Sequence, residues 1–206
     1  MDSATALTRA YLHLNGYFTV TEYPVLELMA GGGYRAATDI DILGYRLPGS
    51  GGLFPAGVGR DAPESQDFVP DSELGEFGVH PDLIIAEVKE GAAELNRGAR
   101  TPAVLAAVLT RFGCAPPAEH SHIVDRLLRT GEARVSTGLR VRLFAFGSSV
   151  PAAGLPGSYR RIALGHVIAF LERHLRQHWD LISRAQIRDP GFGFLAMMEK
   201  ARRGRA

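Results

Sequence analysis

The stretch PDLIIAEVKE, residues 81–90, is a short apolar run that ends in charged residues. Its turn-forming start and apolar middle are typical of a strand that is buried on both faces. Because side chains alternate across a strand, Glu87 and Lys89 share one face with Leu83 and Ile85. A carboxylate and an ammonium group at the end of a buried strand need partners that offset their desolvation. The two interpretations are a simple ion pair and a compact polar site on an apolar scaffold.

A second strand is expected upstream, in the stretch ATDIDILGY at residues 37–45. Acidic residues inside such a β-branched run disfavour both strand formation and burial, so their presence calls for an explanation. By alternation, one face carries Asp39, Asp41 and Leu43, and the other carries Ile40 and Ile42.

If these two strands are neighbours, Asp41 and Glu87 converge, with Lys89 beside them. Two carboxylates that are packed together repel each other unless a cation joins them. Oxygen ligands with an open aqueous side suit Mg²⁺ or Mn²⁺. The sequence therefore predicts a metal site shared by the two strands.

An Asp in one strand, Asp41, and Glu87-Val88-Lys89 at the end of the next resemble the PD-(D/E)XK nuclease superfamily. The resemblance covers roughly residues 3–147, in the order helix, three-stranded meander, crossover helix and further strand. It implies a restriction-endonuclease-like α/β fold, with a central mixed β-sheet flanked by helices. The letters PD also occur at Pro81-Asp82, but Asp82 lies on the same strand as Glu87 and points to the opposite face. The Asp of the motif is therefore assigned to Asp41.

The resemblance implies a metal-dependent nuclease that hydrolyses phosphodiester bonds in nucleic acid, with DNA favoured. Asp41, Glu87 and Lys89 are then the catalytic residues. Asp41, Glu87 and the carbonyl of Val88 are the expected ligands of Mg²⁺ or Mn²⁺. Lys89 is expected to orient the attacking water and to stabilise charge that grows on the phosphate.

A third acidic ligand is less well defined by the sequence. In the superfamily the first helix often supplies an additional Glu, and the expected first helix, residues 3–14, has none. The accessory candidates are Asp39 and Glu22, with Glu27 as a further option.

Two other classes of protein stay open. The same fold hosts catalytically silent modules that bind nucleic acid or serve a structural role, since a fold alone does not define a function. An Asp–Lys–Glu ion network in an unrelated α/β protein is the third interpretation. The substrate (DNA or RNA), its sequence or structure specificity, and a homodimer as the oligomeric state are also open.

Composition sets the broad class. The 206 residues suit a single domain, and 46% hydrophobic and 22% charged residues are ordinary for a globular protein. A net charge of +1 argues against nucleic-acid binding by bulk charge but leaves room for a local basic groove. The single cysteine excludes an internal disulfide, and no apolar run approaches the length of a membrane span. With no signal sequence at the N-terminus, the expected location is cytoplasmic.

The remaining patterns predict one nuclease-like domain over residues 1–206. Its Gly- and Pro-rich insertion at 48–80 joins the two strands of the site, and is either a lid or a tolerated surface excursion. The further expected elements are a strand at 17–28, helices at 102–112 and 120–130, a strand at 139–146 parallel to the Glu87 strand, a short strand at 159–164, and a helical C-terminal extension at 165–206. A basic face is expected from the arginines at 126, 129, 134, 140, 142, 160 and 161.

Overall fold

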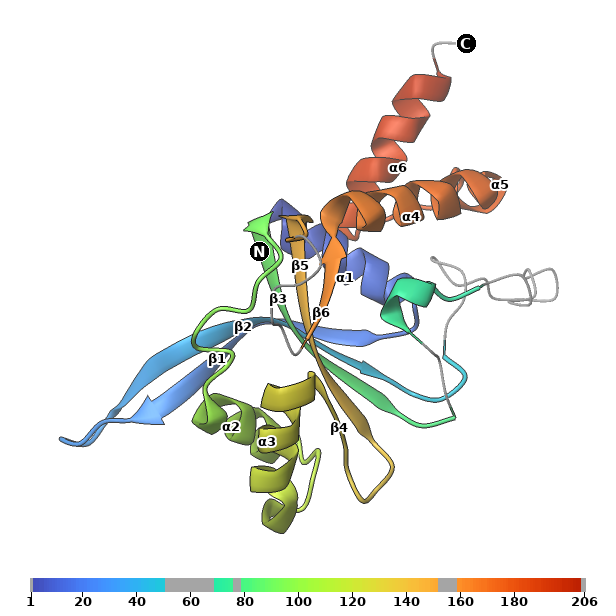
Figure 1. The fold of residues 1–206 in the computed structure, drawn as a ribbon. Coiled ribbons are helices and arrows are strands. Elements are labelled where there is room, and N and C mark those ends of the chain that lie inside the picture. Colours follow the sequence, from blue (N-terminus) through green and yellow to red (C-terminus); the bar gives the residue numbers. More distant parts are fainter. Residues whose placement is uncertain (1, 51–68, 76–78, 152–158, 205–206) are drawn as a thin grey trace.

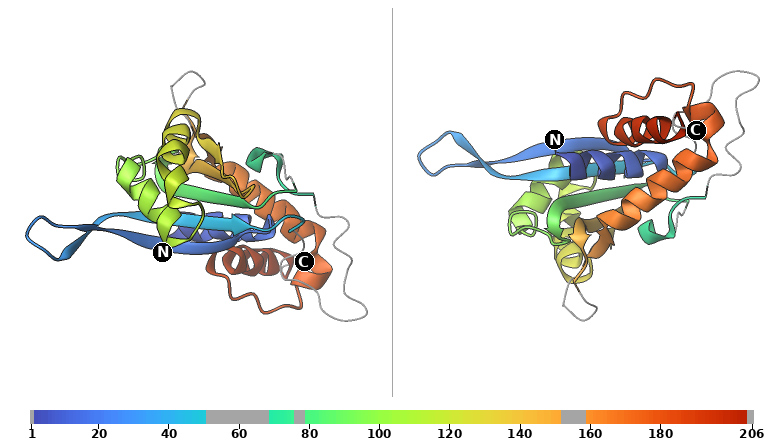
Figure 2. Two further views of the ribbon diagram at one scale, coloured as in Figure 1. Left: turned by 90° about the horizontal axis from the view of Figure 1, so that it is seen from below. Right: turned by 90° about the horizontal axis from the view of Figure 1, so that it is seen from above.

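The computed structural model describes residues 2–50, 69–75, 79–151 and 159–204. Over these residues the chain is an α/β protein, in which a curled mixed sheet has helices on both faces (Figures 1 and 2). The sheet has the strand order β1-β2-β3-β5-β4, and β6 also pairs with β5. The expected α/β class with a mixed sheet flanked by helices is confirmed at this level.

The first half of the sheet is an antiparallel meander. Helix α1 (Ser3–Leu14) leads into β1 (Phe18–Leu28), β2 (Tyr34–Arg46) and β3 (Asp82–Ala92). The β1–β2 hairpin is long and projects beyond the rest of the sheet (Figure 2). By contrast, β2 pairs with β3 only over residues 42–46 of β2. The two strands therefore separate at Asp41.

A crossover then returns the chain to the other side of β3. It consists of α2 (Pro102–Arg111), the 3-10 turn η3 (Pro117–Glu119) and α3 (His120–Thr130). The strand β5 (Arg140–Ser149) follows and pairs with β3 in parallel, as the sequence predicted. A short strand, β4 (Glu132–Arg134), which the sequence did not indicate, pairs with the start of β5.

The C-terminal part begins with β6 (Arg160–Ala163), which runs parallel to β5. Three helices follow: α4 (Leu164–Gln177), α5 (Trp179–Ile182) and α6 (Pro190–Arg203). Helices α1, α4 and α6 lie on one side of the sheet, and α2 and α3 lie on the other (Figure 1). None of the helices in the described part of the chain is both long enough and apolar enough to cross a membrane.

Each face of the sheet has its own hydrophobic core. The core under α1, α4 and α6 includes Ile84, Ala86 and Val88 of β3. The core under α2 and α3 includes Leu83 and Ile85 of the same strand. Alternation along β3 is thus as predicted, and it places Glu87 and Lys89 on the side of α2 and α3.

Alternation along β2 is not as predicted. Ile40 packs in the same core as Leu43, whereas Ile42 packs in the core on the opposite face. The reason is local, because Glu22, which lies across the hairpin at this level, has a φ of +53°. A residue with a φ in the left-handed region leaves the extended conformation of a strand, so the pleat is interrupted at this level of the hairpin. The face on which a side chain of β2 lies therefore changes near Asp41.

Within the predicted insertion at 48–80, residues 51–68 and 76–78 lie outside the described residues, and so does most of the proposed lid. The described part contains the 3-10 turn η2 (Ser72–Leu74). Leu74 is buried in the core under α1 and α4. At least this part of the insertion is integrated into the fold.

Asp82 forms a buried ionic network at the start of β3. Its carboxylate accepts hydrogen bonds from Arg142 Nε at 2.9 Å and Arg140 Nε at 3.0 Å, and from the hydroxyl of Tyr17. Arg142 also donates to the carbonyl of Leu74. Asp82 therefore has the role of a structural anchor on the face opposite Glu87. Because Arg142 is buried, it cannot contribute to the basic face that the sequence suggested.

Candidate functional site

Asp41 lies at the fork where β2 leaves β3. The last pair of the β2–β3 ladder joins Ile42 to Ala86. One residue beyond it, Oδ2 of Asp41 accepts a hydrogen bond from the backbone N–H of Val88 at 2.8 Å. On the side where β2 has left β3, the N–H of Val88 has no strand partner, and the Asp41 carboxylate accepts its hydrogen bond instead. This bond holds the carboxylate of Asp41 beside β3.

Glu87 lies on β3 next to this fork and is fully buried. Its Oε2 accepts hydrogen bonds from Lys89 Nζ at 2.8 Å and from Asn96 Nδ2 at 2.7 Å. Its Oε1 is also buried, but it has no hydrogen-bond partner among the described residues. A buried carboxylate oxygen without a partner is costly, so Oε1 is available to a group that the chain itself does not supply.

Lys89 links the two carboxylates. Its Nζ lies 2.8 Å from Oε2 of Glu87 and 3.6 Å from Oδ2 of Asp41. The side chain of Lys89 is 39% exposed and that of Asp41 is 26% exposed, whereas that of Glu87 is at 0%. The site is therefore buried on the side of Glu87 and open to solvent on the side of Lys89 and Asp41.

The charges in this cluster influence one another. Burial raises the pKa of Glu87 above its ordinary value, and the nearby charge of Asp41 adds to this, although Lys89 and Asn96 oppose it. Burial alone would lower the pKa of Lys89, but the hydrogen bond and charge of Glu87 and the charge of Asp41 outweigh it and raise that pKa. Lys89 is accordingly a firmly protonated ammonium group.

The donor set of the site is suited to a divalent cation. Two carboxylates that share one ammonium group keep an excess of negative charge, and Oε1 of Glu87 has no partner among the described residues. Both features suit Mg²⁺ or Mn²⁺, which use one or two protein carboxylates and keep several waters. In the described part of the chain, no three His, Cys, Asp or Glu side chains cluster as a metal site. The fit is thus to an ion held by two carboxylates.

The structure brings together Asp41, Glu87 and Lys89, with the backbone of Val88 beside Asp41. The accessory candidates do not add a third acidic group in the described residues. Asp39 is exposed and pairs with Pro24 in the hairpin, beyond the point where β2 has left β3.

Asn96 is the residue that sequence reasoning missed. It lies in the connection between β3 and α2, for which the sequence pattern defined no strand or long helix. The separation of nine residues from Glu87 corresponds to no strand or helix period. Its role depends on the path of the connection after β3, which the sequence does not define.

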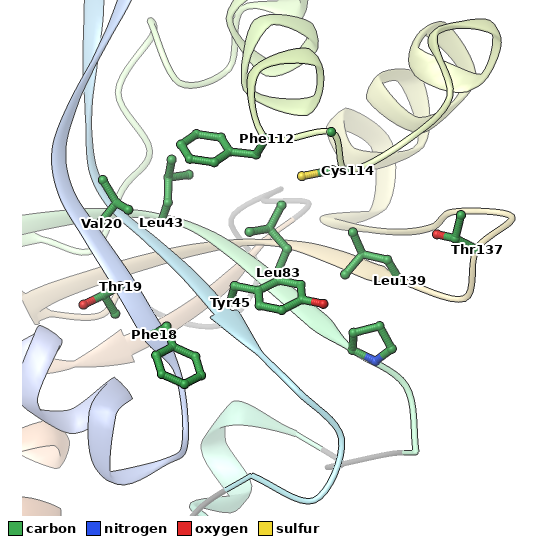
Figure 3. Close-up of a pocket in the computed structure, with 12 residues that line it drawn as sticks. Phe18, Thr19, Val20, Leu43, Tyr45, Leu83, Phe112, Cys114, Thr137 and Leu139 are labelled. Carbon is green, nitrogen blue, oxygen red and sulfur yellow. The ribbon is translucent and has the colours of Figure 1, made fainter.

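An apolar pocket of about 530 Å³ lies farther along the same face of the sheet (Figure 3). Leu83 forms its floor near the start of β3, and Phe112 and Cys114, which follow α2, overhang it (Figure 3). Burial raises the pKa of Cys114 to about 11, so its sulfur stays a thiol rather than a reactive thiolate. Among the described residues, no charged side chain lines this pocket, so it suits an apolar group rather than acid–base or metal chemistry.

No protein-family model matches the chain, and comparisons with curated proteins and with solved structures gave no match.

Proposed function

We propose that the protein is a metal-dependent nuclease with a restriction-endonuclease-like fold, and that it hydrolyses phosphodiester bonds in nucleic acid, with DNA favoured. One observation carries the proposal: Asp41 from β2 and Glu87 and Lys89 from β3 meet at the fork of two strands. Two carboxylates and an ammonium group, open to solvent on one side, are the groups needed for phosphoryl transfer to water.

The topology supports the same proposal. A first helix, an antiparallel meander, a helical crossover and a strand parallel to the third strand follow one another as α1, β1–β2–β3, α2–α3 and β5. The acidic residues stand in the second and third strands of this meander. This is the arrangement that the resemblance to the PD-(D/E)XK superfamily implies.

In the proposed mechanism, Asp41 and Glu87 would hold the divalent cation, with the carbonyl of Val88 as a further ligand. When bound, such an ion polarises the scissile phosphate and lowers the pKa of a bound water. Asp41 and Glu87 hold their carboxylates at fixed positions through Val88 and Asn96.

Lys89 acts as a charged donor. Glu87 and Asp41 raise its pKa, and as an ammonium group it would donate a hydrogen bond to a phosphate oxygen or a water. A fixed positive charge beside the phosphate stabilises the negative charge that develops in the transition state.

A second candidate is a catalytically silent module on the same fold. It is favoured by one observation: the ammonium group of Lys89 already bridges both carboxylates, and Asp41 already has a backbone partner in Val88. In that case the cluster is an ion network that stabilises the fork, and nucleic acid binds without being cut.

Incubation of the purified protein with plasmid DNA, single-stranded DNA and RNA, in Mg²⁺, in Mn²⁺ and in EDTA, tests the proposal. We expect metal-dependent cleavage that Glu87→Gln and Lys89→Met abolish. Glu90→Gln is the matched control, because Glu90 is an exposed residue of the same strand. Cleavage that survives in Glu87→Gln would exclude this site. Binding of nucleic acid without cleavage under any condition would favour the silent module.

A further inference from the structure

The connection between β3 and α2, residues 93–101, crosses the site and is anchored at its first end. The N–H of Ala93 donates to the carbonyl of Ser149 at 2.8 Å, and Arg161 Nε donates to the carbonyl of Ala93 at 3.2 Å. The guanidinium of Arg161 in turn stacks on the ring of Tyr159, at 4.3 Å from its centroid. This end of the connection is therefore tied to β5 and β6.

The other end of the connection is packed against β2. Gly98 lies so close to Thr38 that a Cβ at Gly98 would be 2.5 Å from Oγ1 of Thr38. Ala99 is buried in the core under α2 and α3, and Oγ1 of Thr101 donates to the carbonyl of Arg97 at 3.1 Å. The connection thus spans from β6 to β2 and has little freedom in between.

Asn96 stands in the middle of this connection and uses both ends of its amide. Its Nδ2 donates to Oε2 of Glu87 at 2.7 Å, and its Oδ1 accepts from the N–H of Ala99 at 2.6 Å. The second bond fixes the orientation of the amide, so the NH₂ group points at Glu87. The side chain is consequently preorganised as a hydrogen-bond donor to the carboxylate.

We infer that Asn96 is a positioning residue that holds the Glu87 carboxylate in place for a divalent cation. The inference rests on the proposed function. Oε2 of Glu87 has two donors, of which Lys89 is charged and Asn96 is neutral. When Lys89 turns toward a phosphate, Asn96 is the donor that remains. It keeps Oε2 engaged and leaves Oε1 for the cation, and because Asn96 carries no charge it does not repel that cation.

The physical reason is that a buried carboxylate with no donor either reorients or takes up a proton. Either change removes a metal ligand. Removal of a partner that orients a metal ligand commonly lowers the metal affinity ten- to hundredfold.

Calorimetric titration with Mn²⁺ of the full-length protein and three variants tests the inference. Asn96→Ala removes the donor, and Asn96→Gln keeps the amide but displaces it by one methylene. Thr101→Val is the matched control, because it removes a hydrogen bond of the same connection that does not reach Glu87. We expect Mn²⁺ affinity to fall about tenfold in both Asn96 variants and to stay within about twofold of wild type in Thr101→Val. Asn96→Ala should also lower the melting temperature somewhat, because the N–H of Ala99 loses its acceptor, so the titrations are made at a temperature where every variant is folded.

The outcomes separate the inference from the proposed function. If wild type binds Mn²⁺ and both Asn96 variants bind it equally well, the inference alone fails. If wild type binds no Mn²⁺, the proposed metal site fails and the inference fails with it. If neither Asn96 variant folds while Thr101→Val does, Asn96 has a purely structural role and the inference is overturned.

Discussion

Asp82, the first residue of β3, and Glu87, at the middle of the same strand, lie on its opposite faces and are both fully buried, and their pKa values are shifted in opposite directions. Burial would raise the pKa of both. At Asp82, the hydrogen bonds and charge of Arg142, with Tyr17 and Arg140, outweigh burial and hold the pKa below its ordinary value. At Glu87, burial prevails over Lys89 and the pKa is raised. The partners of Asp82 therefore outweigh the cost of burying its charge, whereas the partners of Glu87 offset that cost only in part.

This contrast predicts opposite pH dependences of stability. The folded pKa of Glu87 lies above its ordinary value of 4.5, so the folded state binds more protons, and stability falls as the pH rises through that window. The folded pKa of Asp82 lies below 3.8, so its stabilising contribution is present above that value and is lost as the pH falls through the folded pKa.

Urea unfolding of wild type, Glu87→Gln and Asp82→Asn between about pH 3 and pH 8 measures both effects. We expect the stability of wild type relative to Glu87→Gln to decrease as the pH rises above 4.5. Relative to Asp82→Asn, wild type should gain stability with pH. Asp82→Asn should cost about 3–5 kcal/mol at neutral pH, because it leaves buried arginine charge uncompensated. If the stability difference from wild type changed with pH in the same direction for both variants, the opposite pKa shifts of Glu87 and Asp82 would be contradicted.

Lys89→Met separates the active enzyme from the silent module. In the nuclease, the ammonium group competes with a divalent cation for the two carboxylates, since its Nζ lies within 3.6 Å of both. Removing it should strengthen Mn²⁺ binding several-fold, because a nearby positive charge is lost, while turnover falls by about a hundredfold or more. Calorimetry and a plasmid assay on the same preparation measure the two quantities. Weaker Mn²⁺ binding by the variant would argue that Lys89 only stabilises the fork.

The strands and helices that carry the site follow from local patterns in the sequence. The apolar run before Glu87 predicts a buried strand, and alternation places Glu87 and Lys89 on one face, as observed. The parallel partner β5 and both crossover helices also follow from their periodicity. These features depend on residues near one another in the chain.

The parts of the site that the sequence did not define depend on tertiary geometry. The positive φ of Glu22 shifts the pleat of the hairpin, so Ile40 lies on a face that simple alternation does not predict. Asn96 reaches Glu87 because the connection after β3 is held against Thr38 and Arg161. Arg142, which the sequence suggested for a basic face, is buried because Asp82 pairs with it.

Two substitutions at Asp41 distinguish its charge from its hydrogen bond to Val88. Asp41→Asn keeps an oxygen that can accept from the Val88 N–H, whereas Asp41→Ala removes it. We expect both variants to lose Mn²⁺ affinity by at least about tenfold, because a charged ligand is gone. Only Asp41→Ala should also lose about 1–2 kcal/mol of stability, since a backbone donor is left unpaired. Calorimetry and urea unfolding report the two effects, and full Mn²⁺ affinity in Asp41→Asn would remove Asp41 from the ligand set.

Arg97 and Arg100 are the arginines that we expect to contact nucleic acid. Both are exposed on the connection that carries Asn96, and neither has an ion-pair partner among the described residues. Arg97 directly follows Asn96, whose side chain contacts Glu87, so both arginines belong to the connection that borders the site. A phosphate backbone in the site would therefore pass near these two cations.

The matched comparison is Arg97→Ala/Arg100→Ala against Arg126→Ala/Arg129→Ala, which removes the same charge from exposed positions on α3. Fluorescence anisotropy with a labelled DNA duplex in EDTA, where no metal supports cleavage, gives the affinity at several salt concentrations. Each lost phosphate contact should reduce the slope of log K against log salt by about 0.9, together with the affinity itself. We expect this reduction for the Arg97/Arg100 pair and a slope like that of wild type for the α3 pair. The reverse result would place the nucleic acid on α3, away from the connection, and the same slope in both variants would show that the pair on the connection makes no special contact.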